Sequence, residues 1–194
     1  DEELCRQYAH LVPLCADMCA LAHILIRKRE NRGSIDLDVK EAQITLSGDR
    51  VEVSEYKRTM AHRIIEEFMI LANETVAEFV TAYELPFVYR VHEKPGEEKA
   101  QGFKVYLQQM GLKAKFHPAN VRPGEYGKIL KELEGDERFR VVNRVMLRSM
   151  SKARYSAENC GHFGLASDCY CHFTSPIRRY PDLLVHRIVK LILD

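Results

Sequence analysis

The chain has 194 residues, of which 46% are hydrophobic and 29% charged, and its formal net charge is +1. This length and composition are typical of one folded domain with a sizeable core. No run of eighteen apolar residues occurs, and the first residues lack the basic and apolar regions of a signal peptide, which argues against a membrane protein. Because an initial Met is also missing, we expect an excised piece of a longer protein, and no obligate protein partner is indicated.

Two helices and a hairpin are predicted in the first half of the chain. Apolar residues recur at helical spacing over 4–27, with Pro13 as a kink or boundary. Residues 43–46 and 50–53 are expected to pair as a β-hairpin. The clearest helix covers 58–82. Its apolar face is expected to contain Ala61, Ile64, Ile65, Phe68, Ala72, Thr75 and Phe79.

The other side of the 58–82 helix carries polar groups among apolar neighbours. At 100° per residue, Glu66 and Asn73 lie together and close to His62. A carboxylate in such surroundings needs a partner. The alternative is a solvated or ion-paired glutamate, because acids are seldom fully buried.

The second half combines one short strand with several helices. A strand is predicted over 88–92, followed by helices over 97–110, 125–133 and 136–152 and a final helix over 182–193. The predicted fold class is therefore mixed α+β, helix-rich, with a few short strands in a single domain spanning 1–194.

The segment HFTSPIRRYPDLL, residues 172–184, places two cations where a helix disfavours them. Ser175 is a good N-cap and Pro176 a good first helical residue, so a helical turn is expected there. Arg178 and Arg179 would then lie beside free backbone N–H groups, where a bound phosphate would resolve the conflict. The alternative is that both arginines point into water or pair with acids. Pro181 should interrupt this turn, so the last helix begins afresh.

Positive charge is concentrated near the carboxyl end. Residues 138–190 contain ten Lys or Arg and three acids. Such a basic region is expected of a nucleic-acid contact surface, although a solvated helix face can look similar.

The six cysteines show no repeated CxxC pairing. Cys160, Cys169 and Cys171 lie near His162 and His172 in sequence, which leaves a zinc site as a minor alternative. Reduced thiols in a cytoplasmic protein are the preferred interpretation.

Three blocks of sequence resemble the RNB exoribonuclease family, and within it the ribonuclease R branch more than the ribonuclease II branch. These are HRIIEEFMILANETVAEF (62–79), PFVYRVHEKP (86–95) and a long block over 153–190 that includes TSPIRRYPDLL. They occur in the family's order, and a match of this length is more specific than a lone motif. The resemblance implies the later part of an RNB catalytic domain, without the upstream Asp motif and the flanking OB-type domains.

The resemblance also implies an activity. Family members hydrolyse single-stranded RNA from its 3′ end to nucleoside 5′-monophosphates with the help of Mg²⁺. Arg178 matches the arginine that contacts the scissile phosphate, and Glu66 looks like the glutamate that contacts the terminal nucleotide, although Glu67 stays open. Further RNA contacts are expected from Arg179, Asn73, Tyr89, Arg90, His92, His172, Ser175 and Arg187.

The metal ligands of the family lie mostly outside this chain, so no metal site is assigned here and this piece alone is expected to be inactive. The nearest acids are Asp36, Asp38 and Glu41, whose alternation instead favours a strand with outward-facing acids. The alternative function is a catalytically inactive RNB homologue that binds RNA without cleaving it.

Overall fold

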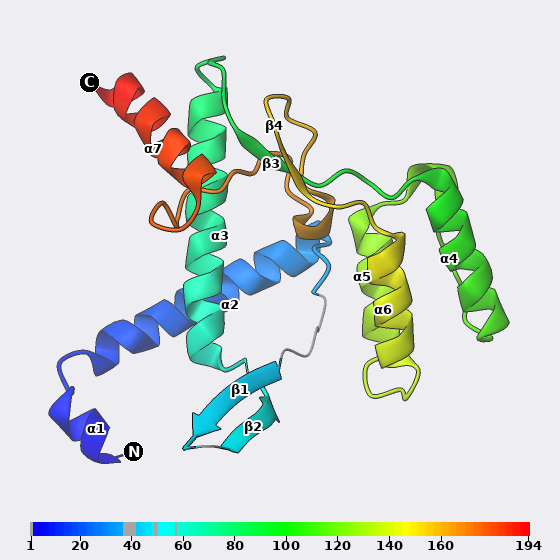
Figure 1. The fold of residues 1–194 in the computed structure, drawn as a ribbon, viewed down its shortest axis with the longest axis horizontal. Coiled ribbons are helices and arrows are strands. Elements are labelled where there is room, and N and C mark those ends of the chain that lie inside the picture. The colour runs from blue at the N-terminus through cyan, green and yellow to red at the C-terminus, as the bar shows by residue number, and fades with distance from the viewer. Residues whose placement is uncertain (1, 37–41, 49, 57) are drawn as a thin grey trace.

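The computed structural model describes residues 2–36, 42–48, 50–56 and 58–194 (Figure 1). Helices dominate and the strands are short and antiparallel, which confirms the predicted mixed, helix-rich fold class. The helices are α1 (Glu2–Gln7), α2 (Val12–Arg32), α3 (Met60–Thr81), α4 (Glu97–Gln109), α5 (Pro123–Glu132), α6 (Phe139–Ser149) and α7 (Tyr180–Leu193), with 3-10 turns η1 (Pro118–Asn120) and η2 (Phe163–Leu165). The strands are β1 (Ala42–Ser47), β2 (Arg50–Glu55), β3 (Tyr89–Val91) and β4 (Arg154–Ser156).

The first predicted helix is two helices, α1 and α2. Pro13 marks the predicted boundary, since it lies in the first turn of α2, where its missing N–H costs no hydrogen bond. α2 then continues beyond the predicted end, and Gly33 terminates it with a φ of 96°. A Cβ on Gly33 would lie 2.9 Å from the backbone of Gly124, so glycine lets α2 end against the start of α5.

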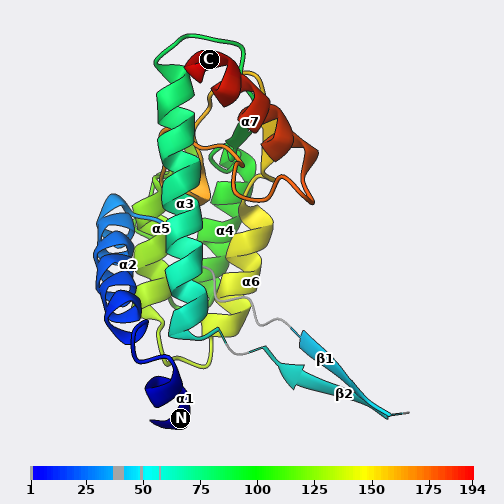
Figure 2. The ribbon, with the colours of Figure 1, turned by 90° about the vertical axis from the view of Figure 1, so that its left-hand side faces the viewer.

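Helix α3 crosses α2 and packs against it (Figures 1 and 2). Its existence is confirmed, but the predicted apolar face is only partly correct, since Ile64, Phe68, Ala72 and Phe79 are half-buried and the other three members are not. Ala61 and Thr75 are exposed, as is Ile65 at 53%. The residues of α3 that are buried are Glu67, Asn73, Ala77 and Val80. Glu67 and Asn73 face inward because α2 and the chain around 170–174 supply their hydrogen-bond partners, whereas His62 is exposed.

The predicted hairpin is confirmed, with Ile44 opposite Val53 and Leu46 opposite Val51. The strand predicted over 88–92 is also confirmed as β3. Its partner β4 was not predicted from the sequence, and the two pair antiparallel with Arg90 opposite Tyr155. A second connection joins Tyr89 to Cys171 through an isolated bridge.

Two hydrophobic cores hold the described chain together. The first lies between α4, α5 and α6. Its most deeply buried members are Phe103, Leu107, Tyr126, Val142 and Met146. The second lies where α7 packs on the C-terminal half of α3 and on β3, and it includes Val80, Val91, Cys171 and Val185. The arginine-bearing segment 172–179 enters α7 beside this second core. That the chain is one domain stays a prediction.

Local signals, a hydrogen bond in one case and a proline in the other, determine where α6 and α7 begin. α6 is shorter than the predicted 136–152 helix, because Asp136 accepts the backbone N–H of Arg138 and so holds the chain outside the helix. The break at Pro181 is confirmed, since α7 begins at Tyr180 with Pro181 in its first turn. None of the described helices is long and apolar enough to cross a membrane.

Candidate functional site

Three of the predicted site residues, Glu66, Asn73 and Arg179, line one groove of about 630 Å³. The groove runs along α3 and is closed by residues from the C-terminal third. Its lining consists of Ala61, His62, Ile65, Glu66, Met69, Ile70, Asn73, Leu165, Tyr170 and Arg179. Apolar walls with a few polar groups are typical of ligand sites.

Glu66 and Glu67 point to different places. The Glu66 carboxylate is 42% exposed at the groove, and Arg58 donates to it from Nε at 3.0 Å and from Nη2 at 2.5 Å. Glu67 is 2% exposed and accepts from Nη2 of Arg29 at 2.7 Å and from its Nε at 3.2 Å. Glu67 therefore fastens α3 to α2, and Glu66 is the carboxylate that lines the groove.

Asn73 organises the loop across the groove. Its Oδ1 accepts the backbone N–H of Phe173 at 2.9 Å and of Thr174 at 3.3 Å. Its Nδ2 donates to the hydroxyl of Tyr170 at 2.9 Å, and burial raises the pKa of that hydroxyl. With 2% exposure and its amide committed to these partners, Asn73 has a positioning role, and its predicted contact with RNA stays a prediction.

Arg178 and Arg179 lie in different environments. The helical turn predicted from Ser175 is confirmed, since the Ser175 carbonyl accepts the N–H of Arg178 at 3.3 Å and of Arg179 at 3.1 Å. Arg178 is exposed ahead of α7 and makes no side-chain hydrogen bond or ion pair within the described residues. Arg179 donates to Asp182, from Nη2 at 2.8 Å and from Nε at 3.1 Å.

The predicted turn therefore carries both arginines, and the alternative of pairing with an acid holds for Arg179. The turn does not continue into α7, because Pro181 allows that helix to start only at Tyr180. The chain resolves the charge conflict at Arg179 with an internal carboxylate, and Arg178 is the cation left available.

Three predicted RNA contacts on or beside β3 lie away from this groove. Tyr89 is 7% exposed in the second core, and its hydroxyl lies 2.9 Å from Oγ1 of Thr81, which favours a packing role. The guanidinium of Arg90 stacks 4.8 Å from the ring centroid of Tyr155. Nδ1 of His92 accepts the N–H of Gly164 at 3.1 Å.

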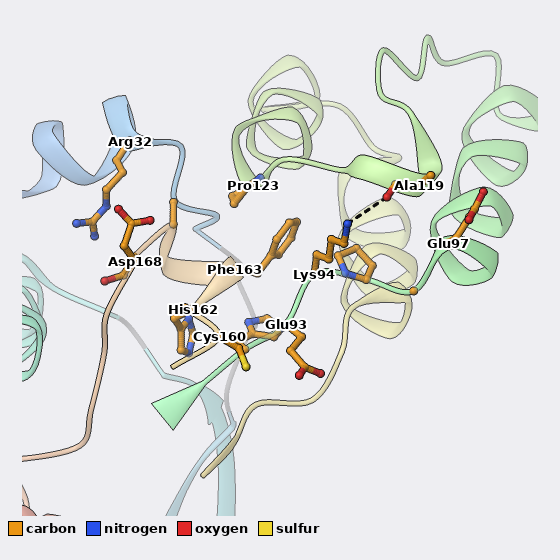
Figure 3. Close-up of a pocket in the computed structure, with 16 residues that line it drawn as sticks. Arg32, Glu93, Lys94, Glu97, Ala119, Pro123, Cys160, His162, Phe163 and Asp168 are labelled. Atoms are coloured by element: carbon orange, nitrogen blue, oxygen red, sulfur yellow. Dashed lines mark hydrogen bonds between the residues drawn. The ribbon is translucent and has the colours of Figure 1, made fainter. Parts of the chain in front are cut away.

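A second, larger pocket of about 940 Å³ lies between β3, η2 and the starts of α4 and α5 (Figure 3). The rings of His92 and His162 lie 5.1 Å apart on its wall, and Lys94 donates to the carbonyl of Ala119 at 3.2 Å. Burial lowers the pKa of His162 to about 3, with the nearby His92 adding to the effect. The two imidazoles of the pocket are therefore neutral at neutral pH, and the cationic side chains in its lining are Arg32 and Lys94.

The other predicted contacts lie on the C-terminal segment. His172 is half-buried, and its Nδ1 lies 2.9 Å from the hydroxyl of Tyr155. Burial, assisted by Arg179 and Arg90, lowers the pKa of His172 to about 4, so at neutral pH it would meet RNA as a neutral ring. Arg187 is exposed on α7, and Ser175 is half-buried with its N–H donated to Asp182.

No group of three or more His, Cys, Asp or Glu side chains that could hold a metal occurs in the described ranges. Asp36 instead pairs with Arg58 at 3.2 Å and with Arg63 at 3.9 Å, whereas Asp38 and Glu41 lie outside the described residues. All six cysteines are free thiols.

Sequence reasoning missed Tyr170, which lines the groove, and Asp182, which holds the groove-lining Arg179. Tyr170 lines the groove 97 positions away from its partner Asn73, so no local pattern marks it. For Asp182 a signal exists, since it follows Arg179 at the i,i+3 spacing of a helical ion pair.

Comparison with known proteins agrees with the sequence resemblance. A family model described as the RNB domain matches residues 9–194. Ribonuclease R of Thermotoga maritima is 46% identical over 197 residues, which cover 100% of this chain and 28% of the relative. Ribonuclease R of Aquifex aeolicus is 45% identical, over 98% of this chain and 27% of the relative. The chain thus spans little more than a quarter of the length of these curated relatives.

Solved structures agree in fold. The apo form of Mycoplasma genitalium RNase R matches with a TM-score of 0.84 at 32% identity, over 89% of this chain and 27% of that one. The same protein has been solved in complex with ribose-methylated single-stranded RNA. Yeast Ssd1, described as a pseudonuclease, matches with a TM-score of 0.60 at 28% identity, over 69% of this chain and 17% of that one. Because the family model covers almost all of its residues, this chain belongs to the RNB family.

Proposed function

We propose that this chain is part of the catalytic domain of an exoribonuclease that hydrolyses single-stranded RNA from the 3′ end and releases nucleoside 5′-monophosphates. Its similarity to ribonuclease R relatives over the whole chain supports the class of enzyme. The direction of RNA hydrolysis, the nucleotide products and the participation of a metal ion are parts of this proposal.

One observation connects the proposal to a particular side chain. Arg178 is an exposed arginine without an internal partner among the described residues, on the turn directly before groove-lining Arg179. An unpaired guanidinium held beside a groove is suited to two oxygens of one phosphate.

The proposed chemistry then divides between Arg178 and Glu66. Arg178 neutralises charge that develops on the scissile phosphate, where a preorganised cation stabilises the transition state more than the ground state. Glu66 accepts hydrogen bonds from hydroxyls of the terminal ribose and so sets the position of the last nucleotide. Met69 and Ile70 give the groove an apolar wall for a base.

A Mg²⁺ ion is proposed for the full-length protein, with most of its ligands outside this chain. The described residues do not fit a metal site by themselves, because Asp36 is neutralised by two arginines and no cluster of ligands occurs among them. No step is therefore assigned to a metal through these residues.

The test is Arg178→Ala in the full-length protein, assayed on a single-stranded oligoribonucleotide. We expect kcat to fall by the equivalent of about 2 to 4 kcal/mol, with a much smaller change in RNA affinity. Arg178→Lys should recover only part of the rate, because a point charge cannot contact two oxygens in the arginine's fork geometry. An unchanged kcat for Arg178→Ala would remove this residue from the mechanism.

The second candidate is an RNA-binding RNB homologue without activity, which the similarity to the pseudonuclease Ssd1 favours. The two candidates separate on the full-length protein. Release of 5′-monophosphates supports the enzyme, and saturable binding without release supports the binding protein. We place either one in the cytoplasm, a location that suits the six free thiols.

A further inference from the structure

We infer that Asp182 is a positioning residue that holds the turn of Arg178 in the orientation needed for cleavage. The inference deepens the proposed function and rests on it. Asp182 lies in the first turn of α7, is 0% exposed, and lines neither groove nor pocket. It can therefore act only through the residues that it holds.

A single oxygen of Asp182 ties both ends of the turn. Oδ2 accepts the backbone N–H of Ser175 at 2.8 Å, which is the start of the turn. The same oxygen accepts Nη2 of Arg179 at 2.8 Å and Nε at 3.1 Å, which is the end of the turn. The tip between them is free, since Ile177 is fully exposed and Arg178 has no side-chain partner among the described residues.

Asn73 continues this support on the other side. It accepts the N–H groups of Phe173 and Thr174, so three consecutive backbone donors, 173 to 175, are held by side chains of two different helices. A backbone fixed in this way limits the directions open to the Arg178 side chain. Prepositioning of this kind lowers the cost of reaching the reactive geometry.

The electrostatics of Asp182 argue against a purely structural role. Its other oxygen, Oδ1, is buried without a hydrogen-bond partner among the described residues. A buried ion pair is weak support for stability and can often be replaced by apolar groups without loss. An incompletely satisfied buried carboxylate therefore calls for another explanation.

We explain the buried carboxylate by the different roles that it gives to Arg178 and Arg179. Asp182 occupies Arg179 and keeps it in the fold, which leaves Arg178 as the free cation at the tip. Loss of the carboxylate would release Arg179 and allow it to compete with Arg178 for the same phosphate.

The experiment is a double-mutant cycle in the full-length protein with single-stranded RNA as substrate. Asp182→Asn keeps an oxygen for the Ser175 N–H and removes the charge that holds Arg179. We expect kcat to fall on the order of 10- to 100-fold, since a displacement of about 1 Å at a catalytic group can cost about 100-fold. KM should change by less than about threefold.

Coupling to Arg178 is the decisive readout. In the Arg178→Ala background, Asp182→Asn should lower kcat no further, because the group that it positions is absent. If Asp182→Asn and Arg178→Ala lower kcat by factors that multiply in the double variant, the inference is overturned, whereas the proposed function is unaffected. An unchanged kcat for Arg178→Ala alone would overturn both.

Two variants separate positioning from folding. Asp136→Asn is the matched control, since Asp136 also accepts a backbone N–H and a guanidinium, both from Arg138, at the start of α6 and outside the groove. It should leave kcat and KM unchanged. Where Asp182→Asn does not fold, judged by circular dichroism, Asp182→Glu keeps the charge and shifts the carboxylate, and the same cycle applies with a smaller loss of kcat.

Discussion

Glu66 and Glu67 are adjacent residues with different surroundings, from which we infer different roles. Glu66 shares a partly exposed ion pair with Arg58 at the groove. Glu67 and Arg29 form a pair in which the side chains are only 2% and 7% exposed. Nη1 of Arg29 also donates to Oγ of Ser34, so the buried guanidinium is well supplied with partners. Exposure at the level of single side chains therefore separates a candidate RNA contact from a structural anchor.

This difference predicts opposite outcomes for the same chemical change. Glu67→Gln leaves Arg29 as an uncompensated buried charge and should cost on the order of 3–5 kcal/mol of stability. Glu66→Gln removes a pair that water screens, and should cost less than about 1 kcal/mol. For activity the order reverses, with Glu66→Gln lowering kcat on RNA more than Glu67→Gln does at a temperature where both are folded.

The measurements are the thermal midpoint and kcat of the two variants in the full-length protein. Each variant serves as the other's control, because they differ by one position on the same helix. A stability loss confined to Glu66→Gln, or a loss of kcat confined to Glu67→Gln, would reverse the assignment of the two carboxylates.

At the scale of elements, helix positions were predictable and buried faces were not. α4 and α7 appear close to their predicted bounds, because Gly, Pro and apolar periodicity are local signals. The inward face of α3 depends on Arg29, 38 positions from Glu67, and on Phe173, 100 positions from Asn73. Strand β4 is three residues long and exists only through its pairing with the distant β3. No local pattern carries such information.

The candidate site divides in the same way. Glu66, Asn73 and Arg179 were predicted and meet at the groove. Their selection came from sequence motifs, whereas their roles came from contacts. Arg179 was expected to touch RNA, but its ion pair with Asp182 depends on the turn that the two prolines shape. Sequence motifs thus identified the residues of the site, whereas tertiary contacts determine which of their side chains are available to a ligand.

Helix α6 carries a charge pattern that a solitary helix disfavours. Arg140, Arg144 and Arg148 are four residues apart and exposed, and none has an ion pair among the described residues. Like charges at this spacing destabilise a helix by about 0.2–0.5 kcal/mol per pair. A polyanion along this face would reverse the effect.

If RNA phosphates contact this face, Arg144→Gln in the full-length protein should reduce the slope of log binding constant against log salt by about one. The same change is expected for Lys152→Gln. Binding of a single-stranded oligoribonucleotide is measured by fluorescence anisotropy between low and moderate salt. Lys131→Gln, an exposed residue of α5 outside the basic third, is the control. A slope that moves equally for all three variants would make the effect one of overall charge.

On the scale of the whole molecule, the described chain has surfaces that its own residues do not cover. The hairpin exposes Ile44, Leu46, Val51 and Val53, each between 63% and 74%, on one face. Figure 2 shows this hairpin extending away from the helices. The chain also spans only 28% of the Thermotoga maritima relative and 27% of the Aquifex aeolicus one. Under the proposed function, the groove is one part of a larger catalytic domain.

The chain by itself and the full-length protein are expected to differ in activity. The 194-residue chain should bind single-stranded RNA through its basic third and fail to hydrolyse it, because no cluster of metal ligands occurs among its described residues. The full-length protein should release 5′-monophosphates with Mg²⁺ and stop when the metal is chelated. Both are assayed side by side on one labelled oligoribonucleotide, with full-length Arg178→Ala as the check for contaminating nuclease. Mg²⁺-dependent hydrolysis by the chain alone, at a rate that Arg178→Ala in the same chain abolishes, would mean that the catalytic ligands lie within these residues.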